Sequence, residues 1–113
     1  MMPTPMEKYD ACTALQRSGQ VAEAVDALKK LTEEHPDFAL AYNALAAWHK
    51  KNGDLDEAVR NAEKYCELEP DDAFGYSILS SYSLAAGMRE KAEDALGRAQ
   101  DLRFRAHFEG RTV

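Results

Sequence analysis

Three histidines and two cysteines are the side chains of this 113-residue chain that would bind a transition metal or supply a thiolate nucleophile. His35, His49 and His107 show no metal-ligand spacing among themselves or with Cys12 and Cys66, and the cysteines form no Cys-x-x-Cys pair. His49 and both cysteines fall at packed helical positions, which is typical of core residues and inert thiols. The sequence contains no glycine-rich phosphate loop, His-Glu-x-x-His motif or nucleophile motif. These residues therefore predict no metal site, no cofactor and no enzymatic activity.

Charge and hydropathy limit the partners that we expect. The net charge is -6, and residues 1–72 carry 8 basic and 15 acidic side chains, whereas residues 73–113 carry 6 and 5. This acidic balance argues against nucleic-acid binding, which depends on clustered Lys and Arg. No apolar run approaches the roughly 18 residues that a membrane span needs, and no secretory signal pattern is present at the N-terminus. We therefore expect one domain, located in the cytoplasm, with no nucleic-acid or membrane partner.

The helices that we expect to carry these histidines and cysteines follow a 34-residue repeat in the sequence. The columns with this spacing hold glycine (Gly19, Gly53, Gly87), alanine (Ala24, Ala58, Ala92) and proline (Pro36, Pro70, with Phe104 in the third place). Each repeat shows the apolar spacing of two helices. We place the helices near residues 5–18, 21–35, 39–52, 55–69, 73–86 and 89–109.

Helix ends are predicted from local signals. Thr4, followed by Pro5 and by Glu7 three residues later, has the pattern of a capping box at the start of the first helix. Asp54 and Glu57 show the same spacing at the start of the fourth helix. The repeated glycines suit the left-handed conformation that ends a helix, because glycine has no Cβ.

These units resemble the tetratricopeptide repeat, a 34-residue helix–turn–helix unit. The second unit carries the signature columns best, in Tyr42, Leu45, Ala46, Gly53, Ala58, Tyr65 and Pro70. The resemblance implies an all-α fold, a solenoid of three helix–turn–helix repeats in a right-handed superhelix. It implies a single domain over residues 1–113, with repeats at 5–38, 39–72 and 73–106 and a short C-terminal extension at 107–113.

The terminal repeats depart from these columns. Glu7 and Lys8 stand where the later repeats have apolar or small residues, and Arg89 and Glu93 stand where the earlier repeats have apolar ones. Polar outer faces are typical of the end repeats of a solenoid, so we expect a finished three-repeat domain. Phe104 and Phe108 share one helical face at i,i+4. They either cover the open end of the core or form a surface for self-association or a partner.

The resemblance also implies a concave groove lined by the first helix of each repeat. The groove columns predict a peptide-binding site at Tyr9, Thr13, Arg17, Leu40, Asn43, Lys50, Lys51, Phe74, Ser77 and Ser81, with Met6, Gln16, Ala47, Leu84 and Ala85 beside them. Arg17, Lys50 and Lys51 favour an acidic or carboxylate-bearing peptide. The predicted function is an adaptor or scaffold that binds a peptide or a partner's helix. The alternatives are homo-oligomerisation through the C-terminal helix and a small secretion-type chaperone.

Overall fold

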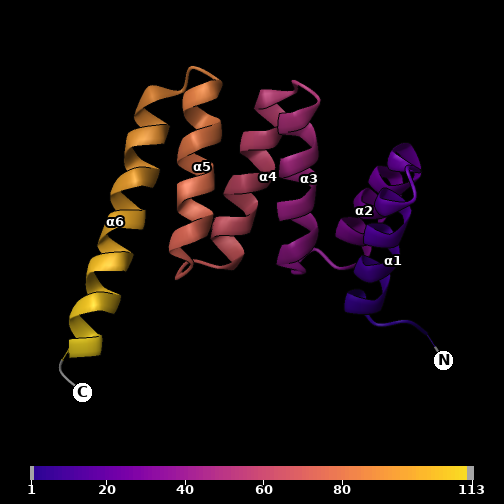
Figure 1. The fold of residues 1–113 in the computed structure, drawn as a ribbon, viewed down its shortest axis with the longest axis horizontal. Coiled ribbons are helices and arrows are strands. Elements are labelled where there is room, and N and C mark those ends of the chain that lie inside the picture. The colour runs from indigo at the N-terminus through magenta and orange to yellow at the C-terminus, as the bar shows by residue number, and fades with distance from the viewer. Residues whose placement is uncertain (1, 112–113) are drawn as a thin grey trace.

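The computed structural model describes residues 2–111, which form six helices and no strand within that range. The helices are α1 (Pro5–Arg17), α2 (Val21–Glu34), α3 (Ala39–Lys51), α4 (Leu55–Leu68), α5 (Ala73–Ala85) and α6 (Arg89–Arg111). They succeed one another along the molecule as antiparallel pairs, from α1 and α2 at the N-terminal end to α6 at the other (Figure 1). The predicted all-α solenoid is confirmed, and the predicted helices differ from the observed ones by one or two residues at their C-terminal ends.

Most of the local signals produce the predicted helix ends. The Thr4 side chain accepts a hydrogen bond from the Glu7 N–H, and the Thr4 N–H donates to the Glu7 carboxylate, both over 3.1 Å. Gly19, Gly53 and Gly87 follow α1, α3 and α5 with φ of 88°, 84° and 78°, as the left-handed conformation requires.

The capping box predicted at Asp54 is wrong. Asp54 is the N-cap residue of α4, but its side chain makes no capping hydrogen bond. Its carboxylate lies 3.7 Å from Nδ1 of His49 instead, on the preceding helix. Asp72 does cap α5, since its carboxylate accepts a hydrogen bond from the Phe74 N–H over 3.0 Å.

The core consists of two apolar clusters that join neighbouring helix pairs. One links α1 and α2 to α3 through Cys12, Val25, Leu28, Leu31, Ala41 and Leu45. The other links α3 and α4 to α5 and α6 through Ala46, Val59, Ala62, Cys66, Tyr76, Leu79, Ala95 and Ala99. Both cysteines are buried, as predicted. The α1–α2 pair packs less extensively on α3 than α4 packs on α5, which leaves space between α1 and α3.

Helix α6 is longer than its partner α5 and projects beyond it (Figure 1). Phe104 and Phe108 lie on this projecting part with 68% and 58% of their surfaces exposed. The expectation that they cover the open end of the core is therefore wrong, and Leu102 packs against the core there instead. Arg89 and Glu93 are exposed and form an ion pair over 3.1 Å, as expected of a polar outer face.

Candidate functional site

A cleft of about 720 Å³ opens between α1 and α3. Side chains from α1, α2 and α3 and the residue that ends α3 line it, namely Tyr9, Gln16, Val21, Ala44, Ala47, Trp48, Lys51 and Asn52. Its volume lies within the range of about 300–1,000 Å³ that is typical of ligand pockets. The cleft thus lies on the side formed by α1 and α3, which are the first helices of the first two helix pairs.

Small and aromatic residues shape this cleft. Ala44 and Ala47 leave room on α3, while the Tyr9 ring is held against Phe38, with 5.8 Å between ring centroids. Trp48 is half-buried and packs edge-on against the His49 ring at 4.9 Å. The walls are therefore about equally polar and apolar, and the polar groups of the lining are those of Gln16, Lys51, Asn52 and the Tyr9 hydroxyl.

Only part of the predicted groove lines this cleft. Tyr9 and Lys51 do so, together with Gln16 and Ala47 from the neighbouring groove columns. Thr13 is half-buried and donates its hydroxyl to the Tyr9 carbonyl oxygen over 3.0 Å, within its own helix. Leu40 and Asn43 are half-buried on α3, outside the cleft.

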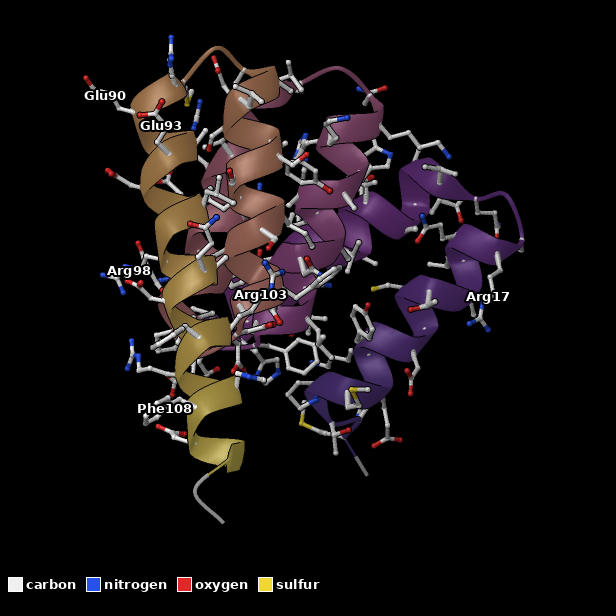
Figure 2. The ribbon with its side chains drawn as sticks, turned by 60° about the vertical axis from the view of Figure 1, so that its left-hand side comes forward. Arg17, Glu90, Glu93, Arg98, Arg103 and Phe108 are labelled. Carbon is white, nitrogen blue, oxygen red and sulfur yellow. The ribbon has the colours of Figure 1, made fainter. Side chains whose placement is uncertain are left out.

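The three predicted rim cations have different surroundings. Lys51 lines the cleft, whereas the Lys50 ammonium lies over the Tyr82 ring, 5.9 Å from its centroid. Arg17 is exposed in the last turn of α1 and points away from the other helices (Figure 2). Of the three, only Lys51 is placed to meet a ligand in the cleft.

The face of α5 supplies a second group of predicted residues. Phe74 is 67% exposed, Ser77 is half-buried and Ser81 is exposed. The Ser77 hydroxyl accepts a hydrogen bond from Arg103 Nη2 over 2.7 Å. Arg103 thus reaches from α6 to the α5 side (Figure 2), where the repeat columns did not place it.

Sequence reasoning also missed residues of the cleft itself. Trp48, Val21, Ala44 and Asn52 were not assigned to the groove, and Trp48 packs against the core as well as lining the cleft. The sequence offered one signal for these residues, which is the pair of small side chains Ala44 and Ala47 on α3. Small side chains leave a hollow only where the facing helix, here α1, does not pack closely against them.

A hollow of about 690 Å³ lies on α6 beside Tyr76 and Glu63, but Lys91 and Arg98 on its rim already have partners. Lys91 donates to the Glu63 carboxylate over 3.0 Å, and the Arg98 guanidinium lies 5.7 Å from the centroid of the Tyr76 ring. A ligand there would have to displace these contacts. The α1–α3 cleft requires no such exchange, so we take it as the candidate site.

The histidines and cysteines lie apart from the cleft. Residues 2–111 contain no group of three or more His, Cys, Asp or Glu side chains placed to hold a metal ion. His49 is buried, as predicted, and its Nδ1 and the Ser83 hydroxyl have no hydrogen-bond partner within the same range. Burial raises the pKa of the Cys12 thiol and raises that of Cys66 to about 11, so neither is an activated thiolate.

None of the described helices is both long and apolar enough to cross a membrane.

Comparison with known proteins identifies the fold. Residues 11–37 match the family model of the tetratricopeptide repeat. A crystal structure of MamA superposes with a TM-score of 0.81 at 20% identity, covering 92% of this chain and 61% of that one. The Yersinia enterocolitica type III secretion translocator chaperone SycD, in an alternative dimer, superposes with a TM-score of 0.75 at 20% identity, covering 90% and 77%. The chain thus spans less than two thirds of MamA, and no curated protein sequence matches it. These superpositions show that the chain shares the helical fold of MamA and SycD.

Proposed function

We propose that this tetratricopeptide-repeat chain is an adaptor that binds a peptide or a partner's helix across α1, α3 and α5. The observation that carries the proposal is the cleft between α1 and α3, which is large enough for an apolar side chain and already open. Preformed clefts that combine apolar contact with a small number of placed polar groups are typical of binding sites, and this cleft has both kinds of wall. A cytoplasmic location stays a prediction from the sequence.

The lining of the cleft defines the ligand chemistry. Tyr9, Val21, Ala44 and Trp48 provide apolar contact for an aliphatic or aromatic anchor residue. Lys51 at the same cleft favours a ligand carboxylate beside that anchor, because complementary charge steers association and sets specificity. The best ligand is therefore a peptide with an apolar residue flanked by acidic ones.

Trp48 makes this proposal directly measurable. It is the only tryptophan of the chain and it lines the cleft, so its fluorescence reports on ligand binding without a label. Peptides with a central leucine flanked by glutamates should shift its emission in a saturable titration. The same peptides flanked by lysines should bind more weakly, and Lys51→Glu should reverse that order.

A filling variant tests whether the cleft itself is the site. Ala47 is exposed, so Ala47→Phe should leave the fold intact. The new ring would fill the cleft, so we expect the affinity for the peptide to fall about tenfold or more. Ala22→Phe is the matched control, since Ala22 is exposed on α2 and does not line the cleft. Equal affinity of the Ala47→Phe variant and the wild type would disprove the cleft assignment.

The remaining groove residues test the length of the site. Asn43 and Phe74 lie on α3 and α5 outside the cleft, and Phe74 offers an exposed apolar contact. If the ligand continues across α5, Asn43→Ala and Phe74→Ala should each weaken binding of long peptides and leave short ones unaffected. Unchanged affinity in both variants would confine the site to the first two helix pairs.

A further inference from the structure

Helices α5 and α6 meet along a line that we call the α5–α6 seam. Two rows of side chains line it, namely Ser77, Ser80 and Leu84 on α5 and Ala92, Leu96, Ala99 and Arg103 on α6. Neighbours within each row are three or four residues apart, so each row lies on one side of its helix. The rows meet at a hollow of about 430 Å³ at one end and through the hydrogen bond from Arg103 to Ser77 at the other.

The hollow suits an apolar side chain. Its lining consists of Ser80, Leu84, Gly87, Arg89, Ala92, Glu93 and Leu96. Leu84 and Leu96 are 66% and 44% exposed there. The polar side chains of the lining already have partners, because the Ser80 hydroxyl donates to the Ala92 carbonyl oxygen over 2.7 Å and Arg89 pairs with Glu93 over 3.1 Å. Covering the two leucines with an apolar group would therefore remove apolar surface from water without breaking these bonds.

Arg103 carries an exposed positive charge at the other end of the seam. The Ser77 hydroxyl accepts one of its N–H groups over 2.7 Å, and this hydroxyl is uncharged. None of the ion pairs within residues 2–111 involves Arg103. A guanidinium has five N–H donors in a planar fork that matches a carboxylate. The bond to Ser77 thus holds the guanidinium in place and leaves donors for a ligand.

The other charges of this region do not oppose an acidic ligand at Arg103. Helix α5 has no charged residue. By the helical period, Glu90, Asp94 and Asp101 fall on the opposite side of α6 from the row that lines the seam. Figure 2 shows Arg98 on the other side of α6 from Arg103. Among the described residues that line the seam, the unpaired charge is therefore that of Arg103, and it is complementary to a carboxylate.

The preceding repeat shows what this surface receives. There, α5 packs on α3 and α4, and its contact includes Val59 and Ala62 of α4. One repeat later these two columns hold Glu93 and Leu96, and both residues line the hollow. The seam is thus the continuation of a surface on which a helix already packs. The exchange of a valine for a glutamate makes the second surface less apolar, so we expect weaker binding there.

We propose that the α5–α6 seam binds a helix of a partner protein, with a leucine in the hollow and a glutamate on Arg103. Ser77 and Leu84 are seven residues apart, as are Leu96 and Arg103, which is about 10.5 Å along each helix. A helix lying along the seam presents its own residues i and i+7 on one side at the same distance. Helix α5 runs parallel to α3 (Figure 1), so a partner helix that packs on the seam in the same way runs parallel to α5 and carries its glutamate at i and its leucine at i+7.

A labelled helical peptide tests the site. It carries one glutamate at i and one leucine at i+7 among alanine and glutamine residues, and fluorescence anisotropy follows its binding from micromolar to millimolar protein. Arg103→Gln should weaken binding about tenfold, because a charge-assisted hydrogen bond is replaced by a neutral one. Arg105→Gln is the matched control, since it removes the same charge from an exposed position on the opposite side of α6 and should leave the affinity unchanged.

A charge exchange and a reversed peptide test the contacts and the direction of the helix. Arg103→Glu should reject the glutamate peptide and bind a peptide with lysine at i. Leu96→Ala should weaken both complexes at an unchanged fold, checked by circular dichroism. A peptide with leucine at i and glutamate at i+7 has the same composition and should bind more weakly. No binding up to millimolar protein, equal affinity of the reversed peptide, an affinity unchanged in Arg103→Gln, or an equal loss in Arg105→Gln would each overturn the proposal.

The seam is separate from the α1–α3 cleft, because the two sites have no lining residue in common. The seam peptide should therefore leave the Trp48 emission unchanged. Short cleft peptides should bind to the Arg103→Gln variant as they bind to the wild type. The two proposals thus fail independently.

Discussion

Gly75 and Gly97 both lie inside helices, yet substitution by alanine should change stability in opposite directions. A Cβ at Gly75 would lie 2.7 Å from Cε1 and 2.9 Å from Cδ1 of Tyr65, on the adjacent helix α4. Carbon atoms in good contact are about 3.5 Å apart, so the ring or the α5 backbone would have to move by about 0.8 Å. At Gly97 the added Cβ meets nothing within 4 Å.

The Tyr65 ring cannot easily move away from a Cβ at position 75. Its hydroxyl donates to the Asp72 carboxylate over 2.5 Å, and this bond is the main reason why the pKa of Tyr65 is raised to about 12. Asp72 in turn caps α5, on which Gly75 lies. Moving the ring away from position 75 therefore strains the contact that holds the start of α5 against α4.

The magnitudes determine the sign at each position. Overpacking costs about 1–3 kcal/mol, and replacing a helical glycine by alanine returns at most about 1 kcal/mol. With the full return subtracted, Gly75→Ala should therefore lower the free energy of unfolding by up to about 2 kcal/mol, and Gly97→Ala should raise it by up to about 1 kcal/mol.

Urea unfolding followed by circular dichroism measures both variants on dilute protein, at an unchanged m-value. The penalty of Gly75→Ala should shrink in a Tyr65→Phe background, where the ring is released from Asp72. If Gly75→Ala stabilised the protein as Gly97→Ala does, the packing argument for this helix contact would be refuted.

Three further predictions concern single groups. Thr4→Ala should cost about 1 kcal/mol in thermal unfolding, because it removes the side chain that caps α1. The Thr4 backbone N–H lowers the pKa of Glu7, so the stability from that bond is present above the usual glutamate pKa of about 4.3 and is lost as the pH falls through the lowered value. Because Thr4→Ala keeps this backbone donor, the test of the acid sensitivity is Glu7→Gln, and a Glu7→Gln variant with wild-type acid sensitivity would contradict the capping box. Burial and the nearby Asp72 charge raise the pKa of Cys66 to about 11, so this thiol should be alkylated slowly at neutral pH and rapidly in urea. Its contribution to stability is present below about pH 8.5 and is lost as the pH rises toward 11. Fast labelling of the folded protein would disprove its burial. Ultraviolet titration should show that Tyr65 ionises near pH 12, and the stability linked to this ionisation should be lost between about pH 10 and 12. The ionisation step near pH 12 and this loss of stability should both disappear in Tyr65→Phe. An ionisation step near pH 12 that persists in the variant would belong to another tyrosine.

Features set within a few residues were predictable from the sequence. The capping box at Thr4 and the left-handed glycines depend on hydrogen bonds and φ values inside one turn of chain, and both are as predicted. Asp54 shows where this reasoning stops. Its spacing to Glu57 fits a capping box, but His49 on the preceding helix lies close to its carboxylate. The side chain lies beside a neighbour outside the local pattern and not on the N–H groups of its own helix.

The 34-residue columns by themselves determined the helix pairs and their order, because burial against a neighbouring repeat imposes the same residue type at the same place in each unit. They also predicted that the face of Arg89 and Glu93 is exposed, because these charged residues replace the apolar residues of their columns. Only the tertiary structure decided that α1 stands off α3, so that Trp48 lines a cleft, and that the end of α6 projects beyond α5, so that Phe104 and Phe108 are exposed. The angle between neighbouring helix pairs and the direction of a projecting helix depend on the summed packing of many side chains. A repeat column records which residues are buried, but it does not record how closely two helices approach.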